Sequence, residues 1–208
     1  MQQSSPTRRR LFAAVAAAAA VLSVGAGTAV AAPVSEAHAS VSAAHASGPL
    51  GRLGPLADWS AQRLATADLV AAAKYGTDSP IDDPAREKVV LETVEQQAKE
   101  SGADPVATVR IFRDQIEANK VVQRALHRRW DAHPAEAPAG RPDLGEVRKE
   151  INRINTGLVQ GIRDSAQARG AAYCTPVTLL SAARVAHARH LDALHTRALA
   201  RSLRTVCD

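Results

Sequence analysis

The spacing of the apolar residues after Gly54 constrains the fold more than any other feature of this sequence. Along the first segment, one stripe of residues recurs every three or four positions, through Leu56, Trp59, Arg63, Ala67, Val70 and Lys74. Residues spaced in this way share one face of an α-helix. The alternation of apolar and polar residues that is typical of a half-buried strand does not occur in the sequence. The pattern therefore predicts an all-α domain.

Two Asp-Pro pairs mark where the next two helices begin. Asp83 and Asp104 each precede a proline, which is the order expected of an N-cap residue followed by the first helical position. The first of these helices is expected to end at Gly102. The second carries an inward-facing stripe as far as Trp130.

A fourth helix follows a loop. The segment from His133 to Pro142 is rich in Pro and Ala and is predicted to be irregular. Asp143 then begins a helix that fades at Gly170. Its inward face contains Leu144, Arg148, Ile151, Asn155, Leu158 and Ile162.

The N-terminal 31 residues have the pattern of a secretory signal peptide. Three arginines at 8–10 precede an apolar run from Leu11 to about Val24, and Ala29-Val30-Ala31 is a small-residue cleavage signal. The run of about 14 residues is shorter than the ~20 that span a bilayer. Residues 9–12 also resemble a twin-arginine signal, so export by the Sec or the twin-arginine route is compatible with the sequence. We expect a secreted protein without a membrane segment after cleavage.

The remaining chain divides into a leader and one domain. Residues 32–50 contain Ala, Ser, His and Gly with almost no large apolar side chain, and are expected to form a flexible leader. Residues 51–208 form the helical domain. Removal of 1–31 leaves 23 basic and 21 acidic residues, a net charge of +2, with five scattered aromatic residues. Nucleic-acid binders cluster basic and aromatic side chains, so a nucleic-acid partner is not expected.

The two cysteines, Cys174 and Cys207, are expected to form a disulfide in an exported chain. The segment 176–204 otherwise reads as one helix, which would separate the cysteines by about 45 Å, whereas a disulfide needs Cα atoms within about 7 Å. An intramolecular bond therefore requires two antiparallel helices that turn near 184–190, which gives a bundle of about six helices. An intermolecular bond or two free thiols are the alternatives.

Polar residues interrupt the apolar stripes at five positions on three helices. Arg63 and Lys74 lie three turns apart on the first helix, Asn119 and Gln123 lie one turn apart on the third, and Arg148 lies on the fourth. A buried charge without a partner costs several kcal/mol. Five such positions predict a polar pocket inside the bundle.

The predicted pocket is cationic. Arg86 adds a fourth basic residue, against Asp83 and Glu87 as the acids, and this balance suits a small, multiply anionic ligand. Each residue also has an ordinary structural role open to it: Asp83 is a good N-cap, Arg63 and Arg86 could extend to solvent, and Lys74 is favoured near a helix end. From these patterns alone we infer an anion-binding helical domain.

Other chemistries lack their residues. His187, His190 and His195, near Asp192, are not spaced to share one helix face, so no metal site is predicted. The sequence has no Gly-rich phosphate loop and no Gly-x-Ser-x-Gly elbow. A cysteine nucleophile is not expected because the cysteines are predicted to be bonded.

From about Leu56 to Cys207 the chain resembles the all-α chorismate mutases, and within them the secreted γ subclass. The polar positions keep the spacing of the family without a gap, and the cysteines fall where secreted members carry theirs. The matching segments are Gln62-Arg63-Leu64, Ala71-Ala72-Ala73-Lys74-Tyr75, Pro80-Ile81-Asp82-Asp83 with Arg86, Ile111-Phe112-Arg113-Asp114-Gln115-Ile116 and Arg189-His190-Leu191-Asp192.

The resemblance implies the rearrangement of chorismate to prephenate, a one-substrate Claisen-type reaction that requires no cofactor. It implies that Arg63 and Arg148 clamp the substrate carboxylates. Lys74 would lie beside the breaking ether oxygen, with Gln123 on the other side. The resemblance also implies a homodimer in which each active site is built within one chain.

The resemblance assigns supporting roles to four further residues. Asp83 corresponds to a main-chain contact with the ring hydroxyl, and Glu87 to an acid that reaches this hydroxyl in some members. Arg86 would support the pocket and a carboxylate, and Asn119 would contact a carboxylate. Val90 replaces an amide found in another secreted member, which predicts a thinner contact with the hydroxyl. The alternative function is a catalytically inactive secreted protein that binds small dicarboxylates of the aromatic pathway.

Overall fold

The computed structural model describes residues 48–208, so the expected signal peptide and residues 32–47 of the expected leader lie outside the described residues. Within 48–208 the regular structure is helical and contains no strand, which confirms the all-α prediction. None of the described helices is long and apolar enough to cross a membrane. The elements are α2 (Pro49–Lys74), α3 (Pro84–Ser101), α4 (Pro105–Ala132), the 3-10 turn η1 (Pro134–Glu136), α5 (Leu144–Asp164), α6 (Ala166–Arg169), α7 (Cys174–Ala188) and α8 (Ala193–Ser202).

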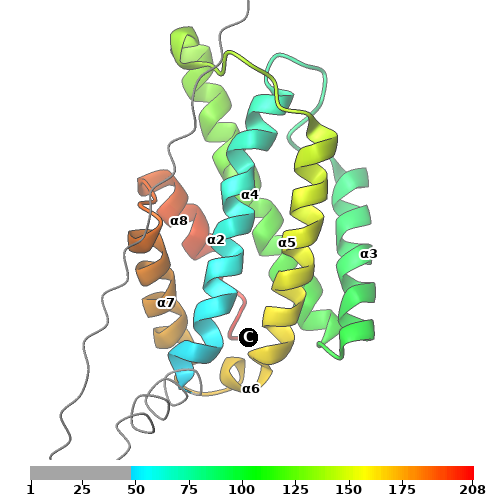
Figure 1. Ribbon diagram of the computed structural model, residues 1–208, viewed down its shortest axis with the longest axis vertical. Coiled ribbons are helices and arrows are strands. Elements are labelled where there is room, and N and C mark those ends of the chain that lie inside the picture. The colour runs from blue at the N-terminus through cyan, green and yellow to red at the C-terminus, as the bar shows by residue number, and fades with distance from the viewer. Residues whose placement is uncertain (1–47) are drawn as a thin grey trace, which may run out of the picture. The chain divides into compact units, whose positions relative to one another are not determined.

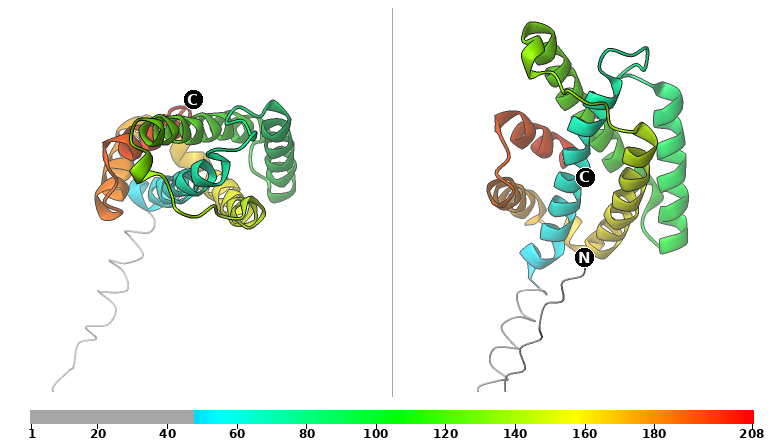
Figure 2. Two further views of the ribbon diagram at one scale, coloured as in Figure 1. Left: turned by 90° about the horizontal axis from the view of Figure 1, so that it is seen from above. Right: turned by 45° about the horizontal axis from the view of Figure 1, so that its top comes forward.

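Helix α2 is the centre of the described domain. It packs against α4, α5 and α7, whereas α3 packs against α4 and α5 on the side away from α7 (Figures 1 and 2). Leu53, Leu56, Leu64 and Ala67 of α2 are almost fully buried. Their contacts with α4, α5 and α7 form one continuous apolar core.

The predicted N-caps form as the sequence indicates. Asp83 accepts a hydrogen bond from the main-chain N–H of Arg86 at 2.9 Å, and Asp104 accepts one from Val106 at 2.8 Å. Asp143 caps α5 through the N–H of Gly145 at 2.6 Å. These bonds satisfy main-chain donors that have no partner inside the helix.

The first helix begins earlier than its apolar stripe suggested. Helix α2 starts at Pro49 and continues through Pro55, so Pro49 and Leu50 are helical although the sequence places them in the leader. A proline inside a helix removes one hydrogen bond and crowds the preceding turn. Here the burial of Leu53 and Leu56 on either side of Pro55 offsets this cost.

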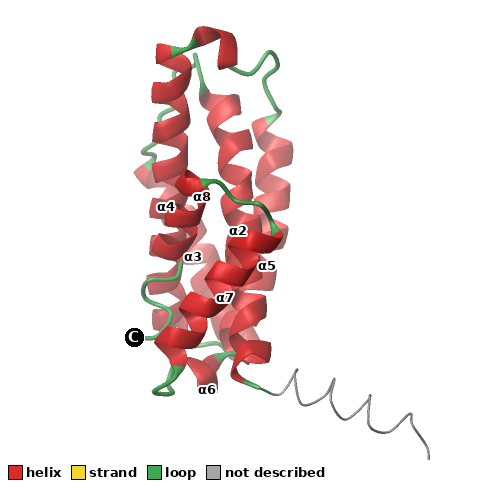
Figure 3. Cartoon of the chain, turned by 90° about the vertical axis from the view of Figure 1, so that its left-hand side faces the viewer, coloured by secondary structure: helices red, strands yellow, loops and turns green. Residues whose placement is uncertain are grey.

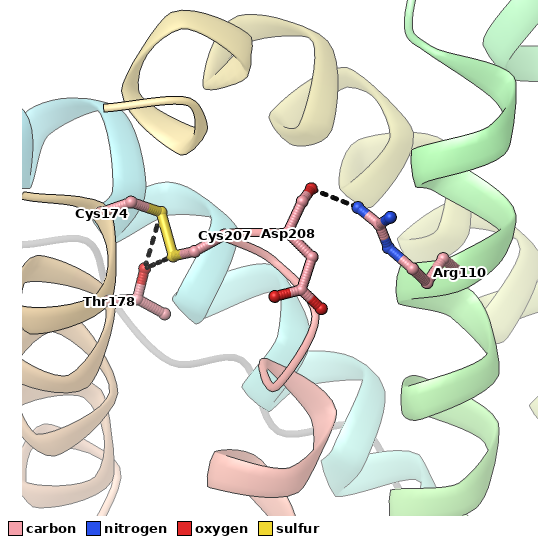
Figure 4. The surroundings of a disulfide bond; sticks show 5 residues. All are labelled: Arg110, Cys174, Thr178, Cys207 and Asp208. Carbon is pink, nitrogen blue, oxygen red and sulfur yellow. Dashed lines mark hydrogen bonds between the residues drawn. A yellow bond between two sulfur atoms is a disulfide. The ribbon is translucent and has the colours of Figure 1, made fainter. Parts of the chain in front are cut away.

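The chain reverses direction between α7 and α8, as the cysteine spacing required. Helix α7 ends at Ala188, His190 takes a positive φ of 51°, and Asp192 caps α8. Cys174 and Cys207 form an intramolecular disulfide with a Cα–Cα distance of 5.7 Å (Figure 4). The predicted bond is thus confirmed.

Helix α8 does not lie along α7 for its whole length. Figure 3 shows both helices on one side of the longer bundle, and α8 packs mainly on α4. The chain after α8 is held there by Asp114, whose carboxylate accepts from Arg204 Nη2 at 3.0 Å and from the N–H of Thr205 at 3.2 Å. Gln115 adds a bond from its Nε2 to the carbonyl of Ser202 at 3.0 Å.

Substitution of Gly157 by alanine is expected to destabilise the domain by about 1–3 kcal/mol, because the added carbon would have to be accommodated in a packed core. Gly157 of α5 faces the ring of Trp59 on α2, and a Cβ built at this position would lie 2.6 Å from the ring. The free energy of unfolding in denaturant measures the loss. Gly161→Ala is the matched control: it lies one turn later on α5, where a Cβ would meet its nearest atoms at 3.6 Å. Equal losses in both variants would contradict the close contact.

His195 is expected to make stability depend on pH. Its ring lies between Asp68 of α2, 2.9 Å from Nε2, and Asp192, 2.8 Å from Nδ1. The hydrogen bond with Asp68 is the largest cause that raises the pKa of His195 to about 9, burial opposes it, and Asp192 adds to it. Because the folded pKa lies above the unfolded value near 6.5, the stabilisation is complete below pH ~6.5 and is lost as pH rises through 9.

Denaturant unfolding of the protein and of a His195→Gln variant at pH 6 and pH 9.5 measures this contribution. The difference between the two proteins should shrink at the higher pH, by at most about 3 kcal/mol. A difference that is independent of pH would contradict the assignment.

Candidate functional site

All eight residues that the sequence assigned to a site line one pocket between α2, α3, α4 and α5. The empty space of the pocket is about 650 Å³ when the solvent in its open mouth is included. Its wall also contains apolar side chains, among them Ile81, Val90 and Ile116. The eight predicted residues are Arg63, Lys74, Asp83, Arg86, Glu87, Asn119, Gln123 and Arg148.

Arg63 is a buried cation held by neutral groups. Only 5% of its surface is exposed. Its Nε donates to Asn155 Oδ1 at 2.9 Å, its Nη1 donates to the carbonyl of Gln115 at 3.1 Å, and its guanidinium lies 5.7 Å from the centre of the Phe112 ring. Burial lowers the pKa of Arg63 to about 10. The side chain is therefore still charged at neutral pH, and its partners leave the charge available to an anion.

Lys74 is the last residue of α2 and its ammonium is fixed by the next loop. Nζ donates to the carbonyl of Pro80 at 2.7 Å. Burial lowers the pKa of Lys74, Asp83 opposes this effect, and Arg148 adds to it. Lys74 and Arg148 line the same pocket, and their like charges favour the binding of an anion there.

The two amides of α4 are joined to each other and to Arg63. Gln123 Nε2 donates to Asn119 Oδ1 at 2.6 Å, and Asn119 Nδ2 donates to the main-chain carbonyl of Arg63 at 3.4 Å. Both side chains are buried, and Gln123 Oε1 has no hydrogen-bond partner among residues 48–208. A buried polar atom without a partner in a pocket wall is typical of a surface that is completed by a ligand.

Three arginines of the pocket form no ion pair within the described residues: Arg63, Arg86 and Arg148. The Asp83 carboxylate caps α3 and offsets part of the charge of Lys74, but it forms no ion pair with these arginines. The pocket therefore carries uncompensated positive charge, which is suited to a ligand with more than one negative group.

Sequence reasoning missed Lys120. It follows Asn119 on α4, it is 8% exposed, and it lines the pocket. Its Nζ lies 3.0 Å from Glu87 Oε1, 3.3 Å from Asp82 and 2.5 Å from Glu117. The i, i+3 spacing of Glu117 and Lys120 could have indicated this one ion pair. The pairs with Glu87 on α3 and with Asp82 in the loop before it become visible only in the folded chain.

The sequence is similar to known chorismate mutases over most of its length. The family described as Chorismate mutase type II matches residues 56–124. A secreted chorismate mutase from Mycolicibacterium smegmatis is 36% identical over 153 residues, which cover 74% of this chain and 84% of the relative. A secreted chorismate mutase from Mycobacterium tuberculosis is 31% identical over 157 residues, or 76% of this chain and 79% of the relative.

Solved structures agree. The chorismate mutase of Burkholderia phymatum superimposes with a TM-score of 0.73 at 34% identity, covering 77% of this chain and 98% of that protein. The secreted chorismate mutase of Yersinia pestis, at 22% identity and a TM-score of 0.60, shares the fold over 75% of this chain and 95% of that one. From the identity to relatives matched along most of their length, together with the shared fold, the chain belongs to the chorismate mutase family.

Proposed function

We propose that this protein is a secreted enzyme that rearranges chorismate to prephenate in the pocket between α2 and α5. The observation that carries the proposal is the set of unpaired arginines and Lys74 around one pocket in a member of this family. Chorismate is a dicarboxylate, and bidentate guanidinium groups match carboxylate geometry. The reaction needs no nucleophile, so a site made of cations and amides is sufficient.

The first task of the site is to hold the substrate in its compact, reactive shape. Arg63 and Arg148 would each bind a carboxylate, so that the two ends of the bond that forms are kept close together. Arg63 suits this role because Asn155 and the carbonyl of Gln115 fix its guanidinium without neutralising it. Arg86, at the start of α3, would support the second carboxylate.

The second task is to stabilise the charge that develops as the ether C–O bond breaks. Negative charge gathers on the ether oxygen in the transition state. The Lys74 ammonium, oriented by the Pro80 carbonyl, would donate to this oxygen from one side. Gln123 has a second N–H besides the one that binds Asn119, and it would donate from the other side. Donors fixed before the reaction lower its barrier because they need no reorganisation.

The remaining predicted residues would fix the orientation of the ring. The main chain at Asp83 and the carboxylate of Glu87 lie on the loop and helix that close the pocket, and would contact the ring hydroxyl. Asn119 would contact a carboxylate while it holds Gln123. Val90 and Ile81 add apolar contacts to the ring.

Secretion and assembly belong to the same proposal. The relatives from Mycolicibacterium smegmatis and Mycobacterium tuberculosis are named as secreted, and the Cys174–Cys207 disulfide suits an oxidising compartment. We propose export through a signal peptide over 1–31, and a homodimer in which each site is built within one chain. All eight predicted site residues gather in one pocket of a single chain, which supports a site that needs no residue from a partner.

Lys74→Ala is expected to lower kcat/KM for chorismate at least about a hundredfold, since it removes a donor to the charge that develops in the transition state. The loss of chorismate absorbance measures turnover. Lys149→Ala is the control, because Lys149 is an exposed lysine of α5 that pairs with Glu146. Tight binding of chorismate by the unaltered protein without turnover would overturn the proposal in favour of an inactive dicarboxylate-binding protein.

The reaction rate is expected to be nearly constant from about pH 5 to pH 8, because an amide at position 123 donates a hydrogen bond at any pH. Gln123→Glu should give a rate that rises toward acid, since a carboxylate can donate only when it is protonated. Profiles of kcat/KM against pH for both proteins make the comparison. A steep rise toward acid in the unaltered protein would exclude Gln123 from this role.

A further inference from the structure

The pocket contains a second lysine that the proposed reaction does not use. Lys120 is buried on α4 and is surrounded by three carboxylates from three places in the chain: Asp82 from the loop before α3, Glu87 from α3 and Glu117 from α4. Burial alone lowers the pKa of Lys120, but the hydrogen bonds with Glu117, Glu87 and Asp82 outweigh it and the pKa is raised. The ammonium is therefore a firmly charged group at the pocket wall.

The three carboxylates differ in how much they depend on Lys120. Asp82 also binds Arg124, with 2.5 Å between Oδ1 and Nη2. Glu117 has a second, longer pair with Arg201 at 3.9 Å. Glu87 has no ion-pair partner other than Lys120 within the part of the chain that the structure describes. Removal of Lys120 would therefore leave Asp82 and Glu117 with an ion-pair partner, whereas Glu87 would keep only the longer-range attraction of cations such as Lys74.

Glu87 lies where an unpaired charge would do most harm. Its side chain is 29% exposed, and the residue lines the same pocket as Arg63, Lys74 and Arg148. A carboxylate in a partly buried site repels a dianion strongly, since the effective dielectric constant there is well below that of water. The pairing with Lys120 reduces this repulsion and so favours the binding of a dicarboxylate in the pocket.

We propose that Lys120 is a positioning residue for the chorismate site: it neutralises and orients Glu87, so that this acid can remain in a pocket built for a dianion. This inference rests on the proposed function. It assigns to Lys120 an effect on substrate affinity that acts through Glu87, and no contact with the reacting atoms. The main consequence is on KM, with little change in kcat.

A double-mutant cycle tests the coupling. Lys120→Met should raise KM for chorismate about tenfold and change kcat less than about twofold, because it exposes the Glu87 charge to the substrate. Lys120→Met combined with Glu87→Gln should return KM to within about threefold of the Glu87→Gln single variant. Lys120→Arg, which keeps the cation, should stay within about threefold of the unaltered protein.

Two controls separate this effect from others. Lys99→Met removes an exposed lysine that pairs with Glu95 on α3, and reports the effect of one lost positive charge away from the pocket. Thermal unfolding of each variant shows whether it is folded. If Lys120→Met does not fold, the KM of Lys120→Arg can still be compared with that of the unaltered protein.

The proposal is overturned if Lys120→Met raises KM as much in the Glu87→Gln background as it does in the unaltered protein, because Lys120 would then act on the substrate directly or only through the fold. An unchanged KM in Lys120→Met would overturn it as well. If the unaltered protein has no turnover, the proposed function fails, and dissociation constants for chorismate in the same variants still decide the role of Lys120.

Discussion

The buried guanidinium of Arg63 is the interaction on which the site depends. It extends from the central helix α2 and binds Asn155 of α5 and the main chain of Gln115 on α4. Three of the four helices around the pocket are therefore joined through one side chain. Because all of these partners are neutral, the charge of Arg63 is held but not cancelled. A carboxylate in place of Asn155 would pair with Arg63 and cancel the charge that attracts a dianion.

Other charges in and around the pocket follow a different principle. These cations and acids are paired: Lys120 with Glu87, Asp82 and Glu117, and Arg124 with Asp82. These pairs join the loop before α3, and α3 itself, to α4. Within residues 48–208, the positive charges of the pocket without an ion pair are therefore those of Arg63 and Lys74 on α2, Arg86 on α3 and Arg148 on α5. The paired charges instead hold α3 and its preceding loop against α4. This difference is what gives the pocket its net positive character.

The C-terminal helices support the site without touching it. Asp114 and Gln115 hold the chain after α8 on α4, and the Cys174–Cys207 bond returns that chain to the start of α7. Gln115 thus binds the C-terminal segment through its side chain, and its main-chain carbonyl accepts a hydrogen bond from Arg63. Packing of α7 and α8 therefore fixes the part of α4 from which Asn119 and Gln123 extend.

Local rules in the sequence were enough to predict most of the helices and, from polar residues on apolar stripes, five of the residues that line the pocket. Asp-Pro pairs begin α3 and α4 because capping involves only neighbouring residues, and polar residues on an apolar stripe must point inward wherever the helix packs. The tertiary structure alone decided the partners: that Asn155 binds Arg63, that Lys120 belongs to the pocket, and that α8 lies on α4. Such contacts join residues far apart in the chain, and the periodicity of one helix carries no information about the side chains of another.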